Sequence, residues 1–390
     1  MYNFSYYSPT KVIFGQGTVP KLIPELQQDG VTRVLLLTGG NSVFASGLYD
    51  TVTGLLKQGN IDFETVRGVQ PNPRLSKVRE AVGVAKSMRA EAILPLGGGS
   101  VFDSAKVIAM GVPSNDDVWD IMTRKAPMGA ALPIYGILTL SGTSSEINNT
   151  GVINNEETHD KFPVANDMLI PKVSVVDPSL QFTVPLHQIR HCGMDALSHV
   201  LEAYFEGLDT TRVIIEHCEA YARGIIRCIN AMPAAQQDYT VRAELAFCSI
   251  YAHSGWASIG RAKRGDFASH RIGHALGALF DVPHGVTLGL IMPAWMQYIY
   301  NQGMQRDVFA RFASQIFGIA DKPGKDLALA GVEALKHFVR SMDMPTSMRE
   351  VGISEADIPA LAENASRTLP FGGVLPMDLQ RITDVLKLAL

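Results

Sequence analysis

The stretch Ala92-Ile-Leu-Pro-Leu-Gly-Gly-Gly-Ser-Val-Phe-Asp-Ser-Ala-Lys106 decides the fold, because it joins a short apolar run to a helical pattern through three glycines. Similar apolar runs, each ending in glycine or a polar residue, occur at 33–40, 134–140 and 173–177. Longer amphipathic stretches separate these runs. This alternation is typical of a parallel sheet covered by helices on both faces, so we predict an α/β domain for residues 1–184.

Beyond about Pro185 the strand-like runs fade, and helical patterns replace them at 196–205, 216–230 and 241–257. We therefore predict a nearly all-helical second domain for residues 185–390. A chain of 390 residues exceeds the size at which one hydrophobic core usually stops growing, so two domains are expected.

The composition, with 46% hydrophobic and 18% charged residues, is that of an ordinary globular protein. A net charge of -4 gives no field that attracts nucleic acid, and no apolar run approaches the ~18 residues of a membrane span. We therefore expect neither kind of partner. The N-terminus lacks the features of a secretory signal, and the four cysteines lack a CxxC or framework spacing. These features predict a cytoplasmic protein with reduced thiols.

The glycine-rich turn at 97–100 follows a predicted strand and opens a helix, so backbone N–H groups and the positive helix end can face a diphosphate. It is neither GxGxxG nor a Walker loop, and a tight connection without a ligand is the alternative. Two further small-polar loops, at 38–42 and 139–148, leave the same edge of the predicted sheet. Because ligands of open α/β sheets bind beyond the carboxyl ends of strands, the three loops together favour a nucleotide site.

The first of these loops bears on the choice of dinucleotide. It has no Asp or Glu to grip a ribose 2′-hydroxyl, whereas Asn41 and Ser42 can donate to a 2′-phosphate. We therefore predict NADP(H), with NAD(H) as the alternative.

Candidate metal ligands form two groups in the second half of the chain. Asp195 and His199 stand at i, i+4 on a predicted helix, His270 and His274 have the same spacing, and His284 follows closely. A carboxylate with imidazoles and no thiolate suits Fe²⁺ or Zn²⁺. If the site is four-coordinate, one clustered histidine is spare, and the spacing alone does not identify it. A spare imidazole either relays a proton or is a hydrogen-bonded structural histidine.

Other side chains near these groups carry weaker signals. His191, His217 and His253 lie in helical patterns without sequence partners, and we predict structural roles for them. Trp256 and Phe267 lead into the histidine cluster and are either part of the core or walls of a substrate pocket.

These motifs together resemble the iron-dependent (group III) alcohol dehydrogenase family, especially its NADPH-linked butanol dehydrogenase and broad aldehyde reductase branch. The matching segments are 12–15, 71–73, 97–106, 138–148, 176–178, 193–199 and 270–285. The resemblance implies a Rossmann-like dinucleotide-binding domain and an all-α metal-binding domain, which is the dehydroquinate synthase-like architecture. It also implies a homodimer.

The resemblance also assigns residues. It implies metal ligation by Asp195, His199, His270 and His284, and it leaves His274 on the nicotinamide side as the catalytic candidate. The cofactor contacts that it implies are Gly39, Asn41, Ser42, Asn72, Gly98, Gly99, Ser100, Asp103, Thr139, Leu140, Asn148 and Lys161. Two positions depart from the usual pattern: Asn41 stands in the first loop, and Ser144 replaces a more usual glycine in the third loop.

The implied reaction is hydride transfer between NADP(H) and a primary alcohol or aldehyde, with Fe²⁺, Zn²⁺ or another divalent metal polarising the substrate oxygen. A glycerol-type polyol dehydrogenase of the same architecture is one alternative. A metal-dependent hydrolase, which would need no dinucleotide, is another, and a catalytically silent nucleotide-binding protein is a third.

Overall fold

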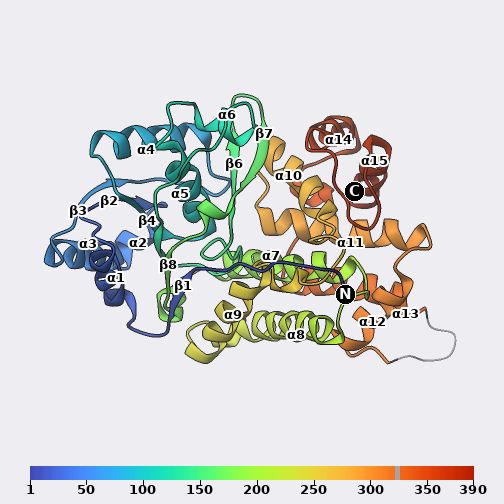
Figure 1. The fold of residues 1–390 in the computed structure, drawn as a ribbon. Helices are drawn as coiled ribbons and strands as arrows, with labels where there is room; N and C mark the ends of the chain where they lie inside the picture. Colours follow the sequence, from blue (N-terminus) through green and yellow to red (C-terminus); the bar gives the residue numbers. More distant parts are fainter. Residues whose placement is uncertain (321–325) are drawn as a thin grey trace. The chain divides into compact units, whose positions relative to one another are not determined.

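The computed structural model describes residues 1–320 and 326–390 (Figure 1). These residues form two compact units, one made of Tyr7–Val184 with Gln237–Ala246 and the other of Met1–Tyr6, Pro185–Gln236 and Phe247–Leu390. Two segments therefore lie on the other side of the division predicted at residue 185: the first six residues belong to the helical unit, and 237–246 belong to the α/β unit. Among the described helices, none is long and apolar enough to cross a membrane.

The α/β unit contains a parallel six-stranded sheet in the order β1-β8-β5-β4-β2-β3. Its strands are β1 (Lys11–Phe14), β2 (Arg33–Thr38), β3 (Asp62–Val66), β4 (Ala92–Gly97), β5 (Tyr135–Leu138) and β8 (Val173–Val176). The four predicted apolar runs are β2, β4, β5 and β8. An antiparallel hairpin, β6 (Thr150–Asn155) with β7 (Asp160–Ala165), stands apart from this sheet and was not predicted.

Helices cover the sheet on both faces, as the apolar runs predict. Along β2, Leu35 and Leu37 belong to one core cluster, whereas Val34 and Leu36 belong to another. Successive strand residues point to opposite faces, so both faces of this strand are buried. The helices of this unit are α1 (Leu22–Gln28), α2 (Ser42–Ala45), α3 (Leu48–Gln58), α4 (Leu75–Ser87), α5 (Gly99–Gly111) and α6 (Val118–Met122). The prediction of a doubly covered α/β sheet is confirmed.

The strand order places a topological switch beside the glycine-rich turn. Strand β2 pairs with β3 on one side and with β4 on the other, so the chain reverses its direction across the sheet at this point. In open parallel sheets, such a switch opens a crevice beyond the carboxyl ends of the strands. The loops after β2 and β4 leave from this position, and the loop after β5 follows from the next strand.

The second unit is helical, as predicted. Its helices are α7 (Leu186–Phe205), α8 (Arg212–Ala235), α9 (Tyr239–Ala252), α10 (Ala268–Phe280), α11 (His284–Asn301), α12 (Arg306–Gln315), α13 (Leu327–Ser341), α14 (Ile358–Ser366) and α15 (Leu379–Leu388), the first part of α9 being grouped with the α/β unit. The predicted helix over 241–257 is wrong at its end, because α9 stops at Ala252 and Gly255 takes a left-handed φ of 83°. A helix cannot continue through that conformation.

Candidate metal centre and dinucleotide loops

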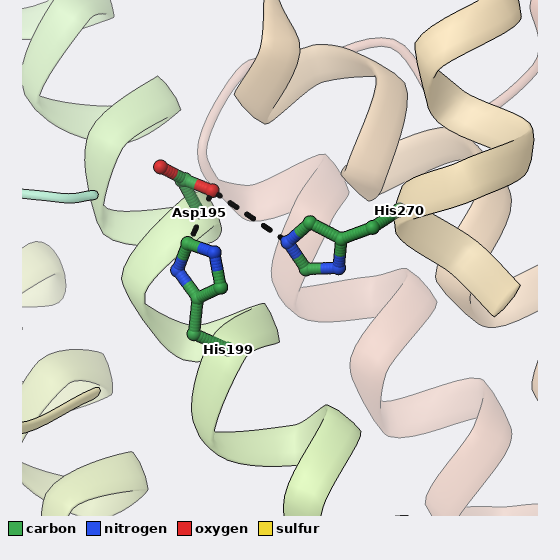
Figure 2. Close-up of side chains that lie close together, drawn as sticks. All are labelled: Asp195, His199 and His270. Atoms are coloured by element: carbon green, nitrogen blue, oxygen red, sulfur yellow. Dashed lines mark ion pairs between the residues drawn. The ribbon is translucent and has the colours of Figure 1, made fainter. Parts of the chain in front are cut away.

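Three helices supply the candidate metal ligands. Asp195 and His199 lie one turn apart on α7, His270 lies in the first turn of α10, and His284 is the first residue of α11. Figure 2 shows the side chains of the first three pointing toward one another. One ligand atom from each of these three lies within 4.8 Å of the others, and all three residues are buried. His284 lies outside that group but close to Asp195.

The distances at this centre fit a shared ion rather than direct hydrogen bonds. Asp195 Oδ1 lies 3.7 Å from His199 Nδ1, 3.9 Å from His270 Nε2 and 3.5 Å from His284 Nε2. These separations exceed ordinary N–H···O distances. Two ligand atoms at about 2.1 Å from one tetrahedral ion stand roughly 3.4 Å apart. The donor set therefore fits a divalent ion held by one carboxylate and three imidazoles.

Burial favours the metal-binding form of the central imidazole. Desolvation, and then the neighbouring histidines His253, His270, His284 and His274, holds the pKa of His199 well below its ordinary value. The ring is therefore neutral near pH 7. Neutral imidazole is the form that donates a lone pair to a metal, so this histidine is available as a ligand without losing a proton.

Glu202 is a functional residue that our sequence reasoning missed. It lies on α7, is 1% exposed, and has a carboxyl oxygen 2.8 Å from His270 Nδ1. Burial raises the pKa of Glu202 to about 8, and a metal held at His270 Nε2 would leave Nδ1 as the donor to the ionised carboxylate. Its oxygens also accept from the backbone N–H of Phe267 at 2.6 Å and of His270 at 3.3 Å. A carboxylate on the second nitrogen fixes the tautomer of a ligating histidine and orients its ring. The available signal was its spacing, two helical turns after Asp195.

The three histidines predicted to be structural have identifiable neighbours. The His253 ring stacks on His199 with centroids 4.2 Å apart and also lies 5.6 Å from Phe267. His217 Nδ1 accepts from Trp256 Nε1 at 3.2 Å. His191 lies 5.8 Å from the ring of His187.

The two aromatic residues that lead into the histidine cluster have different surroundings. The Phe267 ring lies 5.4 Å from His270, next to the metal centre. Trp256 instead packs edge-on against Tyr6, at 5.3 Å between centroids. Proximity to the metal centre thus favours a pocket role for Phe267 over Trp256.

His274 lies one turn after His270 on α10 and is 8% exposed. Its ring centroid is 5.5 Å from that of His284. The one imidazole of the sequence pattern that is not a candidate ligand therefore lies next to His284, which is one.

In the α/β unit, the glycines of the 97–100 turn are needed for packing between loops. A Cβ at Gly99 would lie 2.4 Å from Thr143 Cγ2, and one at Gly98 would lie 3.2 Å from Leu140 Cβ. Both contacts are with the third loop. Thr139 N also donates to Gly97 O at 3.0 Å. The 97–100 turn and the 139–148 loop therefore form one packed surface. Ser100 lies in the first turn of α5, where the N–H of Val101 already donates to Gly98 O at 3.0 Å and the N–H groups of Gly99 and Ser100 precede it.

A buried polar network fixes the third loop to α5. Lys106 Nζ donates to Ser145 Oγ, Asn148 Oδ1 and Thr150 O at 2.7–2.8 Å. Asp103 accepts from Ser145 Oγ at 2.6 Å and from Val152 N at 3.1 Å. Burial lowers the pKa of Lys106 to about 8 and raises that of Asp103. These bonds position the loop, and they engage both oxygens of Asp103 within the protein.

Two other residues predicted to contact the cofactor are hydrogen-bonded to each other. Lys161, on β7, donates from Nζ to Asn72 Oδ1 at 2.8 Å, and both residues are buried. Asn72 has a left-handed φ of 53°, which asparagine tolerates better than most residues. The pair joins the hairpin to the turn that precedes α4.

The first loop carries Gly39, Asn41 and Ser42 directly after β2, and the last two are exposed. Next to it, the guanidinium of Arg67 lies 3.6 Å above the ring of Phe44 on α2. Arg67 follows β3, the strand that pairs with β2. The sequence analysis missed this arginine because its position beside the first loop depends on strand order.

Comparisons with known proteins agree with this architecture. Family models match the chain over residues 9–178, as iron-containing alcohol dehydrogenase, and over 190–390, as the C-terminal part of the Fe-containing alcohol dehydrogenase family. The chain is 34% identical to NADH-dependent butanol dehydrogenase A of Clostridium acetobutylicum over 99% of both sequences. It is 31% identical to the NADPH-dependent aldehyde reductase YqhD of Escherichia coli over 93% of this chain and 92% of that protein.

A solved structure supports the same assignment. The crystal structure of NADH-dependent butanol dehydrogenase A from Thermotoga maritima matches with a TM-score of 0.96 and 40% identity, covering 100% of this chain and 99% of that one. The resemblance identified in the sequence is thereby confirmed along its whole length. The chain belongs to the iron-containing alcohol dehydrogenase family and is a metal-dependent alcohol dehydrogenase or aldehyde reductase that uses a nicotinamide cofactor.

Proposed function

We propose that the protein interconverts primary alcohols and aldehydes with NADP(H), and that Asp195, His199, His270 and His284 hold its metal. The observation that carries the ligand assignment is the position of Asp195 Oδ1, with three imidazole nitrogens at 3.5–3.9 Å. The family is iron-containing, and the same nitrogen and oxygen ligands also accept Zn²⁺.

A bound ion supplies Lewis acidity that polarises the substrate oxygen, and a bound nicotinamide supplies or accepts the hydride. The side chains of this protein hold and orient these groups. Glu202 keeps Nδ1 of His270 protonated, so that Nε2 faces Asp195. In the α/β unit, the first turn of α5 supports the diphosphate with its N–H groups.

The remaining contacts of the predicted dinucleotide site have supporting roles. The pair of Asn72 and Lys161 presents a polar group to the nicotinamide ribose. Gly98 and Gly99 allow the loop of Thr139 and Leu140 to approach the diphosphate turn. Asp103 and Asn148 act through the network around Lys106, which fixes that loop.

The preference for NADP(H) is supported by the residues around the first loop. Asn41 and Ser42 offer neutral donors, and Arg67 provides the cation that commonly accommodates a ribose 2′-phosphate. The relatives include both NADH-dependent and NADPH-dependent enzymes. The proposed preference for NADPH therefore rests on the side chains of this chain. An NADH preference remains the competing outcome of the test.

His274 is the proposed proton relay. Its position beside His284 supports a path from the substrate oxygen through this imidazole. His274→Ala is expected to lower kcat and to change its pH profile, whereas substitution of a purely structural histidine would change stability alone. An unchanged rate and profile would leave proton transfer to the ribose hydroxyls.

The substrate partner is a small alcohol or aldehyde, and we propose that the protein is a cytoplasmic homodimer. Edge strand β1 supports dimerisation, because Val12 and Phe14 on it are 36% and 38% exposed and one side of the strand has no partner within the described sheet. Val12→Lys combined with Phe14→Lys is expected to produce monomers in analytical ultracentrifugation. The four free thiols suit a reducing compartment.

The decisive experiment measures oxidation of NADPH and of NADH with butyraldehyde, using metal-stripped protein with and without added Fe²⁺ or Zn²⁺. The proposal expects metal-dependent turnover with a higher kcat/KM for NADPH. Preference for NADH would refute only the proposed binding of a 2′-phosphate by the 38–42 loop and would leave the rest of the proposal intact. Activity on glycerol without activity on simple aldehydes would favour the polyol dehydrogenase alternative.

A further inference from the structure

Helix α7 carries a second pair of potential metal ligands outside the metal centre. His187 lies in its first turn and His191 one turn later, and their ring centroids are 5.8 Å apart. Imidazoles at i, i+4 on one helix are a recurrent metal-binding arrangement. With metal–nitrogen bonds of about 2.1 Å, two imidazole centroids on one ion stand roughly 5 to 6 Å apart. The observed separation is therefore compatible with both imidazoles binding one ion.

The pair continues directly into the metal centre. His187, His191, Asp195 and His199 follow one another at intervals of four residues along α7. Each interval rotates the position by about 40° and advances it by about 6 Å, so successive members are neighbours on a slowly winding stripe. Along this stripe the residues change from exposed at His187, through half-buried at His191, to buried at the two candidate ligands.

The exposed side of the metal centre lies next to this pair. The His284 side chain is 26% exposed, against 5–7% for the other three candidate ligands. The next residue, Gly285, packs against the backbone of His191 so closely that an added Cβ would lie 2.0 Å from its carbonyl oxygen. The accessible ligand and the half-buried histidine are therefore held together by a contact that only glycine permits.

The local charges do not prevent a cation from binding at the pair. Arg190 is the nearest cation in the sequence, and its guanidinium is engaged by Asp343 at 2.7 Å. Burial, and then His187, lowers the pKa of His191, so its neutral form is available near pH 7. The positive end of the helix opposes a cation only weakly, and this effect is small beside the energy of two metal–nitrogen bonds.

We propose that His187 and His191 form a second divalent-cation site that delivers metal to the centre. The metals expected there are those that prefer imidazole, such as Zn²⁺, Co²⁺ and Ni²⁺. The delivery role rests on the ligand set proposed above, whereas binding at the pair does not.

Binding at the pair is tested with untagged, zinc-loaded protein titrated with Ni²⁺ by calorimetry at neutral pH. We expect a further binding equivalent in the wild type that is absent in His187→Gln. Because His187 is exposed, this substitution should leave the fold unchanged. The matched control is His337→Asn, which changes an exposed histidine on α13 and should retain the further equivalent. Persistence of the equivalent in His187→Gln would overturn the proposal.

Delivery is tested by mixing metal-free protein with limiting Co²⁺ and following the absorbance of the tetrahedral ion. His187→Gln should slow the appearance of this absorbance several-fold without reducing its final amplitude, and His337→Asn should match the wild type. An unchanged rate in His187→Gln would refute delivery. Asp195→Asn should lose the Co²⁺ absorbance. If this variant keeps the absorbance, the proposed metal centre is wrong. The Ni²⁺ titration tests binding at His187 and His191 separately from that outcome.

Discussion

Glu202→Gln is expected to weaken metal binding by roughly 10- to 100-fold, or about 1.4–2.7 kcal/mol. The substitution keeps the size of the side chain but removes the negative charge that accepts from His270 Nδ1 at 2.8 Å. A neutral amide orients that imidazole less firmly and makes it a weaker donor to the metal. It can also present its NH₂ group to Phe267 N–H, where the carboxylate accepts at 2.6 Å.

The assay is competition for Zn²⁺ or Co²⁺ with a chelating indicator, followed by activity as a function of free metal. Glu219→Gln is the matched control, because Glu219 is also buried but pairs with Arg311 and Tyr204 away from the metal centre. The control is expected to lose stability and retain metal affinity. Wild-type affinity in Glu202→Gln would refute the orienting role of this carboxylate.

Three further substitutions test the α/β unit. Ser144→Gly should raise the free energy of unfolding in chemical denaturation by about 0.5–1 kcal/mol, because Ser144 has a left-handed φ of 53° that glycine adopts without strain. A loss of stability would mean that the Ser144 hydroxyl stabilises the fold by more than the backbone strain costs. Burial raises the pKa of Glu146 to about 7 from 4.5, so the folded state binds the proton more tightly and stability should fall by up to about 3 kcal/mol as pH rises between these values. Glu146→Gln should reduce the slope of the apparent free energy of unfolding against pH, while the raised pKa values of Glu202 and Asp266 maintain the rest of it, and an unchanged slope would contradict the assignment. Arg67→Ala should raise the KM for NADPH roughly tenfold and leave that for NADH unchanged, and equal effects on both would exclude a 2′-phosphate contact.

The strands that the sequence revealed are those buried on both faces. Strands β2, β4, β5 and β8 are mostly apolar and almost wholly buried, whereas β3 lies at the sheet edge and alternates exposed with partly buried residues over Asp62–Val66. The hairpin of β6 and β7 was missed for a related reason, because residues such as Asn154, Asp160 and Lys161 interrupt any apolar pattern. Hydrophobic periodicity therefore identified the core of the sheet but not its edge.

The sequence predicted which candidate ligands lie together on one helix, but not which helices meet at the centre. Helical spacing pairs Asp195 with His199, but it does not reveal that α10 and α11 bring His270 and His284 to the same carboxylate oxygen. The choice among the clustered histidines came from family resemblance. Stacking of His253 on His199 depends on how the end of α9 packs, and it has no signal in sequence spacing.

Removal of the metal is expected to destabilise the helical unit because of the charge that the centre buries. Asp195 and Glu202 are 3% and 1% exposed, and burial raises the pKa of Glu202 to about 8. A divalent cation beside neutral imidazole ligands would favour the charged forms of both carboxyl groups. Buried charges without such compensation are costly. A metal present at 100 times its Kd adds about 2.7 kcal/mol to the free energy of unfolding. Thermal denaturation with and without a chelator measures this difference, and Asp195→Asn should abolish it. If the chelator leaves the wild-type transition unchanged, these buried carboxyl groups are protonated or are compensated by the protein alone, and the charge argument for the metal centre fails.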